Sequence, residues 1–495
     1  MRRRLGGALA RVPWIAWACA AVALLNGVVW SLLQPPFQPP DEVAHVAYVQ
    51  RIAETGRLPE RLPNDFEMFS PEQTQLMLAL RVVQVRGVLG NVPPLSAGQT
   101  AGVRKVEAAK LSRTPVDAGT ASGNPPLYYL LGAAVYRISP STTLLNRIFL
   151  LRLMSALMSA LTALLVVLFV RELMPSAPWA WAAGGLAAAF QPTFGAISGA
   201  VNADSLLFVA CAGALLATAR ILRRGLGRGD GVLLGTSCAV GVLTKPLFYG
   251  LVPGVALGLA IVLWRSRREL VATLRRAVPG AACFVAPVAL WLLALHTFWQ
   301  RPADHVKDVP VPGPAPAPPL HGLGTKLTFM WELFLPRLPG MTDHQPGYPL
   351  RDVWVREWTG HFGQLDYGFP QWVYDWSGRA LLALGAIALV GLVARAWRAR
   401  RAPSWGAPLL VCLVFAAGVA FAIGWSQWSA VQVSGPPFEQ GRYLLPLLGL
   451  YAALVAVCVR ALGRRWGPLL GAVIVVASIG LSVYAQMLTI VRYAT

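Results

Sequence analysis

The chain has 495 residues, 56% of them hydrophobic and only 13% charged, and its mean hydropathy is +0.54. This composition excludes a soluble globular protein and predicts an all-α polytopic membrane protein. The formal net charge of +21 does not indicate nucleic-acid binding, because most of the basic excess lies in short arginine clusters between apolar stretches. Such clusters are typical of the cytoplasmic ends of membrane spans.

With the arginine clusters on the cytoplasmic side, the apolar stretches predict about eleven spans and a cytoplasmic N-terminus. The first stretch is long enough to be an uncleaved span rather than a signal peptide. The predicted spans are residues 13–33, 145–170, 178–198, 203–221, 231–244, 247–264, 278–299, 379–396, 406–425, 442–460 and 467–489. The apolar stretch 124–139 is too short to span, which favours a helix at the outer surface.

Two large hydrophilic loops face the outer side of this single integral membrane domain, residues 1–495. The first loop, 34–144, contains an amphipathic helix over 43–55 next to the membrane. The second loop, 300–377, begins with a proline-rich stretch at 309–319 and continues with several tryptophans. Tryptophans at a membrane boundary indicate interfacial anchors, and a sugar-stacking role is the alternative.

Four sets of polar residues next to the spans mark a candidate site, because such groups are energetically unfavourable near a bilayer and are often functional. All four sets fall on the outer side, although the arginine clusters alone determine the topology. Together they assemble carboxylates and cations in one layer, as transfer from a phosphate leaving group requires. The sets are Asp41 and Glu42, followed by His45; Asn202 and Asp204; Lys245; and Glu439, Gln440, Arg442 and Tyr443.

Each acidic residue has a structural interpretation that the sequence alone leaves open. Asp41 and Glu42 come immediately before a predicted helix, and Asp204 opens another. Carboxylates at these positions cap helices and complement the helix dipole. The acidic residues are therefore either helix caps or a reactive set, and one carboxylate of the first pair can cap while its neighbour reacts.

The basic residues have structural alternatives as well. Lys245 fits a side chain that extends to the membrane interface, and Arg442 fits a loop charge paired with Glu439. Arg147, near the start of the second span, lies on the outer side against the usual distribution of positive charge. Its position favours an interface residue or a phosphate contact.

Five motifs, in order and spacing, resemble a family of bacterial integral membrane proteins of unassigned function, DUF2142, which is grouped with the GT-C glycosyltransferases. The resemblance covers residues 35–446 and implies a GT-C-like fold. The motifs are Pro-Pro-Asp-Glu-x-x-His from Pro39, Asn-Pro-Pro-Leu-x-Tyr from Asn124, Asn-x-Asp from Asn202, Thr-Lys-Pro from Thr244, and Gln-Gly-Arg-Tyr-x-x-Pro from Gln440.

The resemblance implies inverting transfer of a sugar from a polyprenyl-phosphate donor to a glycan, lipid or protein acceptor, outside the bacterial inner membrane. It implies Asp41 as the base and Glu42 and Asp204 as further acidic residues of the catalytic set. Asp41 and Asp204 could together hold Mg²⁺ or Mn²⁺, which prefer oxygen ligands. The implied substrate-binding residues are His45, Asn124, Tyr128, Arg147, Asn202, Lys245, Glu439, Gln440, Arg442 and Tyr443.

Three other functions remain open at this point. A transporter or lipid flippase usually carries its charges near the bilayer midplane and in repeats, whereas these charges lie at one edge and no repeat is visible. A polymerase or ligase of envelope polysaccharide would share the chemistry and differ in its acceptor. A non-catalytic scaffold would tolerate the loss of the acidic and basic residues together.

Overall fold

The structure is a computed structural model that describes residues 12–59, 69–85, 88, 92–297, 322–344, 350–398, 405–434 and 440–494. The proline-rich stretch 309–319 and Glu439 lie outside these residues. Helices account for nearly all regular structure, and the described strands are one short antiparallel pair, β1 (His361–Phe362) and β2 (Tyr367–Gly368). The prediction of an all-α polytopic membrane protein is confirmed.

Nine helices in the described part of the chain are long and apolar enough to cross a membrane. In three of them a 3-10 segment (η) leads into the α-helix. They are α2 (Trp14–Leu33), α8 (Leu144–Leu173), α11 (Asp204–Arg224), η3 (Pro246–Leu251) with α13 (Val252–Arg265), η4 (Arg267–Glu269) with α14 (Leu270–Thr297), α17 (Gln371–Arg398), α18 (Gly406–Ser434), η6 (Gly441–Leu447) with α19 (Leu448–Ala461), and α20 (Gly463–Ala494).

Two of the eleven predicted spans have a different form. The predicted span 178–198 is divided into α9 (Pro178–Ala189) and α10 (Pro192–Ser198), because Pro192 has no N–H to continue the first helix. Gln191 precedes the second piece and caps it by accepting the N–H of Phe194. The span predicted at 231–244 is the 15-residue helix α12 (Arg228–Val242), which is shorter than a straight span requires.

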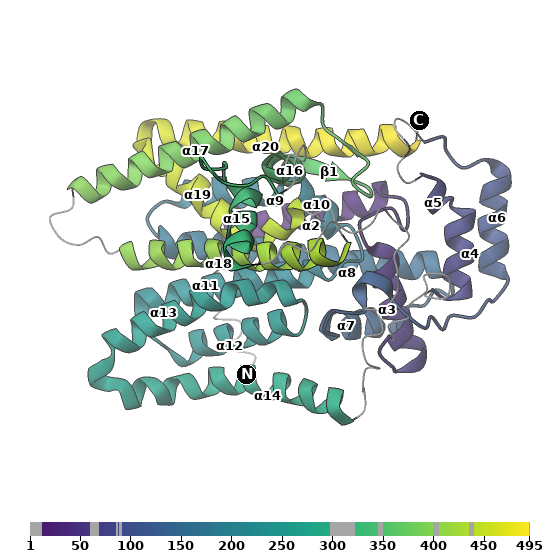
Figure 1. The fold of residues 1–495 in the computed structure, drawn as a ribbon, viewed down its shortest axis with the longest axis horizontal. Helices are drawn as coiled ribbons and strands as arrows, with labels where there is room; N and C mark the ends of the chain where they lie inside the picture. Colours follow the sequence, from purple (N-terminus) through teal and green to yellow (C-terminus); the bar gives the residue numbers. More distant parts are fainter. Residues whose placement is uncertain are drawn as a thin grey trace.

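The first predicted outer loop forms a group of short helices at one end of the molecule (Figure 1). The helix predicted over 43–55 is α3, and the apolar stretch 124–139 forms α7, which has only 12 residues. The turn between α13 and α14, where arginines cluster, lies at the opposite end (Figure 1). The helices of this group are α3 (Glu42–Thr55), α4 (Pro71–Ala79), α5 (Val82–Val85), α6 (Ala97–Ala108) and α7 (Leu127–Ile138).

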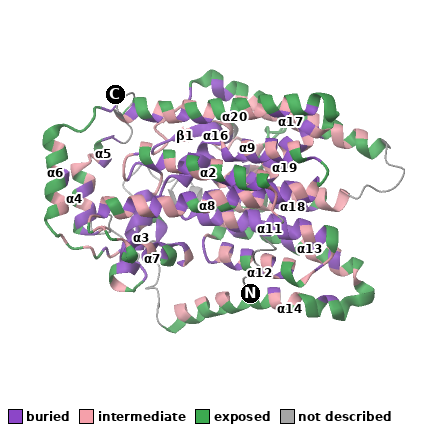
Figure 2. Ribbon diagram, turned by 180° about the vertical axis from the view of Figure 1, so that it is seen from behind, coloured by how far each residue is buried: buried purple, intermediate pink, exposed green. Residues whose placement is uncertain are grey.

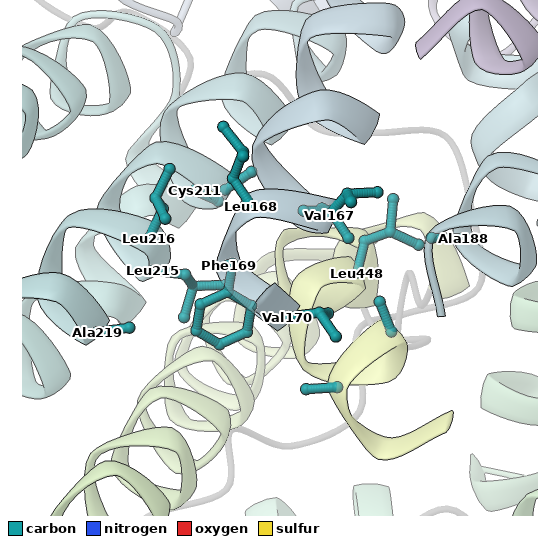
Figure 3. Packing of buried hydrophobic residues seen from close by; sticks show 14 of the residues in the cluster. Val167, Leu168, Phe169, Val170, Ala188, Cys211, Leu215, Leu216, Ala219 and Leu448 are labelled. Atoms are coloured by element: carbon teal, nitrogen blue, oxygen red, sulfur yellow. The ribbon is translucent and has the colours of Figure 1, made fainter. Parts of the chain in front are cut away.

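The buried core lies in the central helices α2, α8, α9, α11 and α19, whereas α14, α17 and α20 are largely exposed (Figure 2). Small residues allow close packing there: a side chain at Gly184 of α9 would meet the carbonyl oxygen of Ala452 in α19. Larger side chains fill the space between helices, as Phe169, Leu215 and Leu448 do in Figure 3. The exposed apolar faces of α14 and α17 are those expected to contact lipid.

Segments far apart in the sequence meet near the turn that precedes α3. The ring of Tyr48 in α3 stacks on that of Tyr129 in α7, with centroids 3.7 Å apart. The second outer loop contributes α15 (Leu323–Phe334), α16 (Leu350–Gly360) and the β1–β2 hairpin. Gln364 in the hairpin donates to the carbonyl oxygens of Gln38 and Pro39 at 3.3 and 3.1 Å. The second loop therefore contacts the turn that precedes α3, which belongs to the first loop.

Candidate functional site

The turn at Asp41 presents its carboxylate away from the helix that it precedes. Asp41 has a left-handed backbone, with φ of 59°, which aspartate tolerates better than most residues. Its side chain makes no capping hydrogen bond to α3. Instead, one carboxylate oxygen accepts from Thr120 at 3.3 Å and the other pairs with Arg442. The capping interpretation is therefore wrong for the side chain of Asp41.

Four charged side chains meet in one cluster, which we call the charge quartet: Asp41, Asp204, Lys245 and Arg442. The ammonium of Lys245 lies 2.5 Å from Oδ1 of Asp204. Nη2 of Arg442 bonds Oδ2 of Asp41, and its Nε lies 3.8 Å from Oδ2 of Asp204. The capping interpretation also fails for Asp204, because the N-cap of α11 is Ala203 and the carboxylate faces cations.

The quartet is mostly buried but open on one side. The side chains of Asp204 and Arg442 are 2% and 4% exposed, whereas those of Asp41 and Lys245 are 26% and 16% exposed. Burial by itself raises the pKa of Asp41, but Arg442 and the other neighbouring groups, Lys245 among them, together outweigh burial and hold that pKa well below its ordinary value. Asp41 is therefore ionised at neutral pH while Arg442 is its partner.

The quartet retains hydrogen-bonding capacity that the described protein atoms do not use. Nε and Nη1 of Arg442 and Oδ2 of Asp204 are buried without a hydrogen-bond partner among the described residues. Buried polar groups are almost always hydrogen-bonded in folded proteins. Two guanidinium donors left over in a buried position are the groups that would contact an anionic ligand.

His45 lies one turn after Asp41 and borders the quartet. Its Nδ1 lies 2.8 Å from the hydroxyl of Tyr129. Burial lowers the pKa of His45 to about 4, although the negative charge of Asp41 opposes this effect. The imidazole is thus neutral at physiological pH and links the quartet to the aromatic stack of α3 and α7.

Glu42 is directed away from the quartet and is fully engaged. Its oxygens accept from Nε and Nη2 of Arg152 at 2.8 and 2.6 Å, and from the backbone N–H groups of Phe37 and Val201 at 2.8 and 2.9 Å. The side chain is fully buried. Four hydrogen bonds to three different segments indicate that Glu42 fixes the turn that carries Asp41.

Asn202 connects the two acidic segments. Its Oδ1 accepts the backbone N–H of Asp204 at 2.9 Å, and its Nδ2 donates to the carbonyl oxygen of Pro40 at 3.3 Å. Asn202 is fully buried. It therefore holds the start of α11 against the Asp41 turn. The two-residue spacing of the Asn-x-Asp motif lets the Asn202 amide bond both the backbone of Asp204 and that of Pro40.

The predicted aromatic and amide residues surround the quartet at different distances. The ring of Tyr443 lies 5.6 Å from Nζ of Lys245 and 5.5 Å from Cζ of Arg442, so it contacts both cations. Tyr128 is buried, and its hydroxyl lies 2.9 Å from Oγ of Ser155. Asn124 donates to the hydroxyl of Tyr129 at 3.0 Å, and the same hydroxyl contacts His45.

Arg147 lies apart from the charge quartet. Its Nη1 is 3.7 Å from the carboxylate of Glu54, and its guanidinium lies over the ring of Tyr136 at 4.2 Å. Nε donates to the carbonyl oxygen of Ser141 at 3.0 Å. Those contacts anchor the end of α3 to α7 and α8, so the structure does not bring Arg147 to the quartet.

Glu357 was not predicted, and the structure places it beside the quartet. It lies on α16 in the second outer loop, and its Oε2 accepts the N–H of Gly441 at 2.5 Å. Burial raises the pKa of Glu357 to about 7, against the lowering effects of that hydrogen bond and of Arg442. The only signal in the sequence is its position between the tryptophans Trp354 and Trp358.

The described residues contain no group of three or more His, Cys, Asp or Glu side chains placed to hold a metal ion. The carboxylates of Asp41 and Asp204 are each engaged by a cationic side chain. A Mg²⁺ or Mn²⁺ ion at this pair would have to displace Lys245 or Arg442, and such an ion remains a prediction from the resemblance.

Comparison with known proteins gives one family match. The family model described as predicted membrane protein (DUF2142) matches residues 24–451. No curated protein matches the chain.

Among solved structures, the chain is similar to the oligosaccharyltransferase of Archaeoglobus fulgidus in the apo form, with 14% identity and a TM-score of 0.44. It is also similar to that protein tethered with an acceptor peptide containing the NVT sequon, with 14% identity and a TM-score of 0.42. Both alignments cover 97% of this chain, but only 56% and 55% of the oligosaccharyltransferase. The chain thus spans little more than half the length of these structures.

Proposed function

We propose that this chain, which belongs to the DUF2142 family of predicted membrane proteins, is a multi-pass membrane glycosyltransferase of the GT-C type. It transfers a sugar from a polyprenyl-phosphate donor to a glycan, lipid or protein acceptor. The site faces the extracytoplasmic side of the bacterial inner membrane. The family match confirms the resemblance drawn from the five motifs, and the donor and the acceptor class come from that resemblance.

The observation that carries the proposal is the convergence of two carboxylates and two cations in the charge quartet. Arg442 is 401 positions away from Asp41 in the chain, yet their side chains are bonded. The two cations suit a phosphate that gains negative charge as it leaves, and a carboxylate suits the proton of an incoming hydroxyl. The quartet is buried and has guanidinium donors without a partner among the described residues. These features favour a binding site for an anionic ligand over a purely structural cluster of ion pairs.

In the proposed reaction the acceptor hydroxyl attacks the anomeric carbon of the donor sugar. The new carbon–oxygen bond forms as the bond to the phosphate oxygen breaks, and its electron pair leaves with polyprenyl phosphate. Lys245 and Arg442 stabilise that charge, and Asp41 takes the proton of the hydroxyl. One displacement at the anomeric carbon inverts its configuration.

Asp41 can act as a base only after its partner changes. While Arg442 is bonded to Asp41, the pKa of the carboxyl is too low for efficient proton transfer. A donor phosphate that pairs with Arg442 competes with Asp41 for the guanidinium, and the pKa of Asp41 then rises. We therefore expect donor binding to activate the base.

Glu42 contributes to this function by position. Its four hydrogen bonds hold the turn, and a carboxylate so fully engaged has no lone pair directed at a substrate. We assign the catalytic proton transfer to Asp41 and the alignment of Asp41 to Glu42.

The test is complementation of a gene deletion by Asp41→Asn. In the deletion strain the unused lipid-linked sugar accumulates, and mass spectrometry of the lipid extract identifies it. Wild-type protein should remove this species, whereas Asp41→Asn should leave it, because loss of a general base lowers the rate by about 10²–10⁴-fold. Protein levels are compared by immunoblotting of membranes.

Asp230→Asn is the matched control. Asp230 is 22% exposed and lies 3.7 Å from Arg220, so it resembles Asp41 in burial and in having an arginine partner, but it belongs to α12, away from the quartet. This variant should complement like the wild type. Full complementation by Asp41→Asn at normal protein levels would refute the assignment of the base.

A further inference from the structure

A cavity adjoins the quartet on the side of Arg442. About 370 Å³ of space lies in and in front of it, most of this space is open to solvent, and the enclosed part has room for only a water molecule or two. Both outer loops and the short helix α10 contribute to its wall. Among the lining residues are Glu357, Gln440 and Arg442, which are polar, and Ile197 and Phe362, which are apolar.

Three buried polar side chains of the wall offer complementary hydrogen-bonding groups. Glu357, Gln440 and Arg442 are 6%, 5% and 4% exposed. Oε1 of Gln440 and Nη1 of Arg442 have no hydrogen-bond partner within the described ranges. Glu357 bonds Gly441 through Oε2. The wall therefore provides an amide acceptor, a guanidinium donor and a carboxylate.

The segments around Glu357 contribute few other charges. Arg356 on α16, Arg442 on η6 and His361 on β1 are the charged or titratable groups nearest to it. Burial lowers the pKa of His361 to about 4, so the imidazole is neutral at pH 7. The α10 helix offers the hydroxyl of Thr193, which donates to the carbonyl oxygen of Glu357 at 2.7 Å.

The packing of α15 and α17 against the other side of α16 is aromatic. Trp354 of α16 stacks on Phe334 of α15, with ring centroids 5.1 Å apart. The guanidinium of Arg356 lies 5.4 Å from the ring centroid of Tyr374 in α17. These contacts fix α16, and the Tyr374 hydroxyl, which is a phenol and therefore neutral at pH 7, adds no charge beside Glu357.

We propose that a sugar ring binds at the open mouth of this cavity through its hydroxyl groups, and that Glu357 and Gln440 accept hydrogen bonds from those hydroxyls. A sugar hydroxyl both donates and accepts, which matches a wall that contains a carboxylate, an amide oxygen and a guanidinium.

The assignment of this sugar as the acceptor rests on the proposed function. Pro40, which precedes Asp41, and Arg442, which pairs with it, both line the cavity, so a hydroxyl at the cavity mouth lies near the base. Asp204 and Lys245 lie on the other part of the quartet and do not line the cavity. The donor phosphate and the acceptor ring therefore occupy different sides of Arg442.

The test is a binding measurement that does not need transfer. Purified protein in lipid nanodiscs is mixed with methyl α-D-glucopyranoside, methyl α-D-mannopyranoside or methyl β-D-galactopyranoside, and saturation-transfer NMR detects bound ligand at pH 8. We expect a signal from at least one glycoside. Glu357→Gln should weaken its affinity about tenfold or more, because a hydrogen bond to a charged group is lost.

Glu332→Gln is the control, because Glu332 is a buried glutamate of the same outer loop that does not line the cavity. This variant should bind like the wild type. Gln440→Met, which removes the amide oxygen at similar volume, should weaken binding as Glu357→Gln does and provides a second variant if the first misfolds. Lowering the pH from 8 to 6 should weaken binding in the wild type and leave Glu357→Gln unchanged, because the glutamate becomes protonated.

Absence of a signal with all three glycosides would overturn the proposal, as would equal binding by the wild type and both cavity variants. Sugar binding in a protein that fails to transfer would leave the cavity assignment standing and refute the proposed function. Transfer with normal dependence on acceptor concentration in Glu357→Gln would refute the cavity assignment alone.

Discussion

Replacement of Arg152 by methionine should unfold the Asp41 turn without touching the quartet. Arg152 is 3% exposed, and its guanidinium donates to both oxygens of Glu42. It also donates to the carbonyl oxygens of Ser31, Gln34 and Pro35 at 2.9, 2.7 and 3.0 Å. These three carbonyls belong to the end of α2 and the segment after it, so Arg152 joins the first span to the turn.

The expected magnitude follows from burial. Removing one partner of a buried ion pair leaves an uncompensated charge and typically costs about 3–5 kcal/mol. Glu42 is fully buried and keeps only the N–H groups of Phe37 and Val201 when Arg152 is lost. We expect Arg152→Met to lie at the upper part of this range, because three carbonyls lose their donor as well.

The double variant Glu42→Gln with Arg152→Met tests whether the unpaired charge of Glu42 causes the loss of stability. Removal of both charges should recover part of the stability lost in Arg152→Met, since no buried charge then remains unpaired. The assay is thermal denaturation of detergent-solubilised protein, followed by fluorescence-detected gel filtration. An Arg152→Met protein as stable as the wild type, or a double variant less stable than either single variant, would refute this reasoning.

Two further predictions concern the contact between α16 and η6. Gly441→Ala should destabilise the protein by about 1–3 kcal/mol and reduce sugar transfer, because the added Cβ would lie 2.5–2.6 Å from atoms of Glu357 and Trp358. The control is Gly480→Ala, whose added Cβ meets no atom within 4 Å. This control should melt like the wild type in the same assay. Because the folded-state pKa of Glu357 is about 7 against an ordinary 4.5, the wild type should lose roughly 3 kcal/mol relative to Glu357→Gln as the pH rises from 4.5 to above 7. Parallel melting curves of the two proteins at pH 5 and pH 8 measure that difference, and an equal gap at both pH values would contradict it.

The spans could be predicted because their length and composition are local properties. The division of the third span was also visible in principle, since Pro192 cannot continue a helix and Gln191 is suited to cap the next one. The apolar composition of residues 178–198, taken alone, predicts one continuous span. A 15-residue helix such as α12 likewise keeps the composition of a span although it is shorter than one.

The arginine clusters predict on which side of the membrane the site residues lie, but not their lateral position. They predict a shared outer layer for Asp41, Arg147 and Arg442, and this layer stays a prediction. Only Arg442 reaches Asp41, whereas Arg147 pairs with Glu54 at a different place. Lateral position depends on which helices pack together, and no periodicity in the sequence carries that information.

Glu357 could not be predicted for the same reason. A glutamate on a short amphipathic helix looks like a solvated surface residue, and Glu357 is buried because α16 packs against Gly441 in η6 and against α10. Glu42 shows the converse case. Its adjacency to Asp41 suggested a shared role, but successive residues at a helix start point in different directions, and its carboxylate reaches Arg152 instead.

The charge balance of the quartet explains how the proposed reaction could proceed without a large change in local charge. Two carboxylates and two cations are together neutral, so a donor phosphodiester with one negative charge brings the site to minus one. Transfer turns this phosphate into a monoester with a second negative charge, while the hydroxyl proton neutralises Asp41. The total remains minus one on both sides of the reaction. A buried cluster of low effective dielectric disfavours any step that changes its net charge, so proton transfer to Asp41 and departure of the phosphate should be coupled rather than sequential.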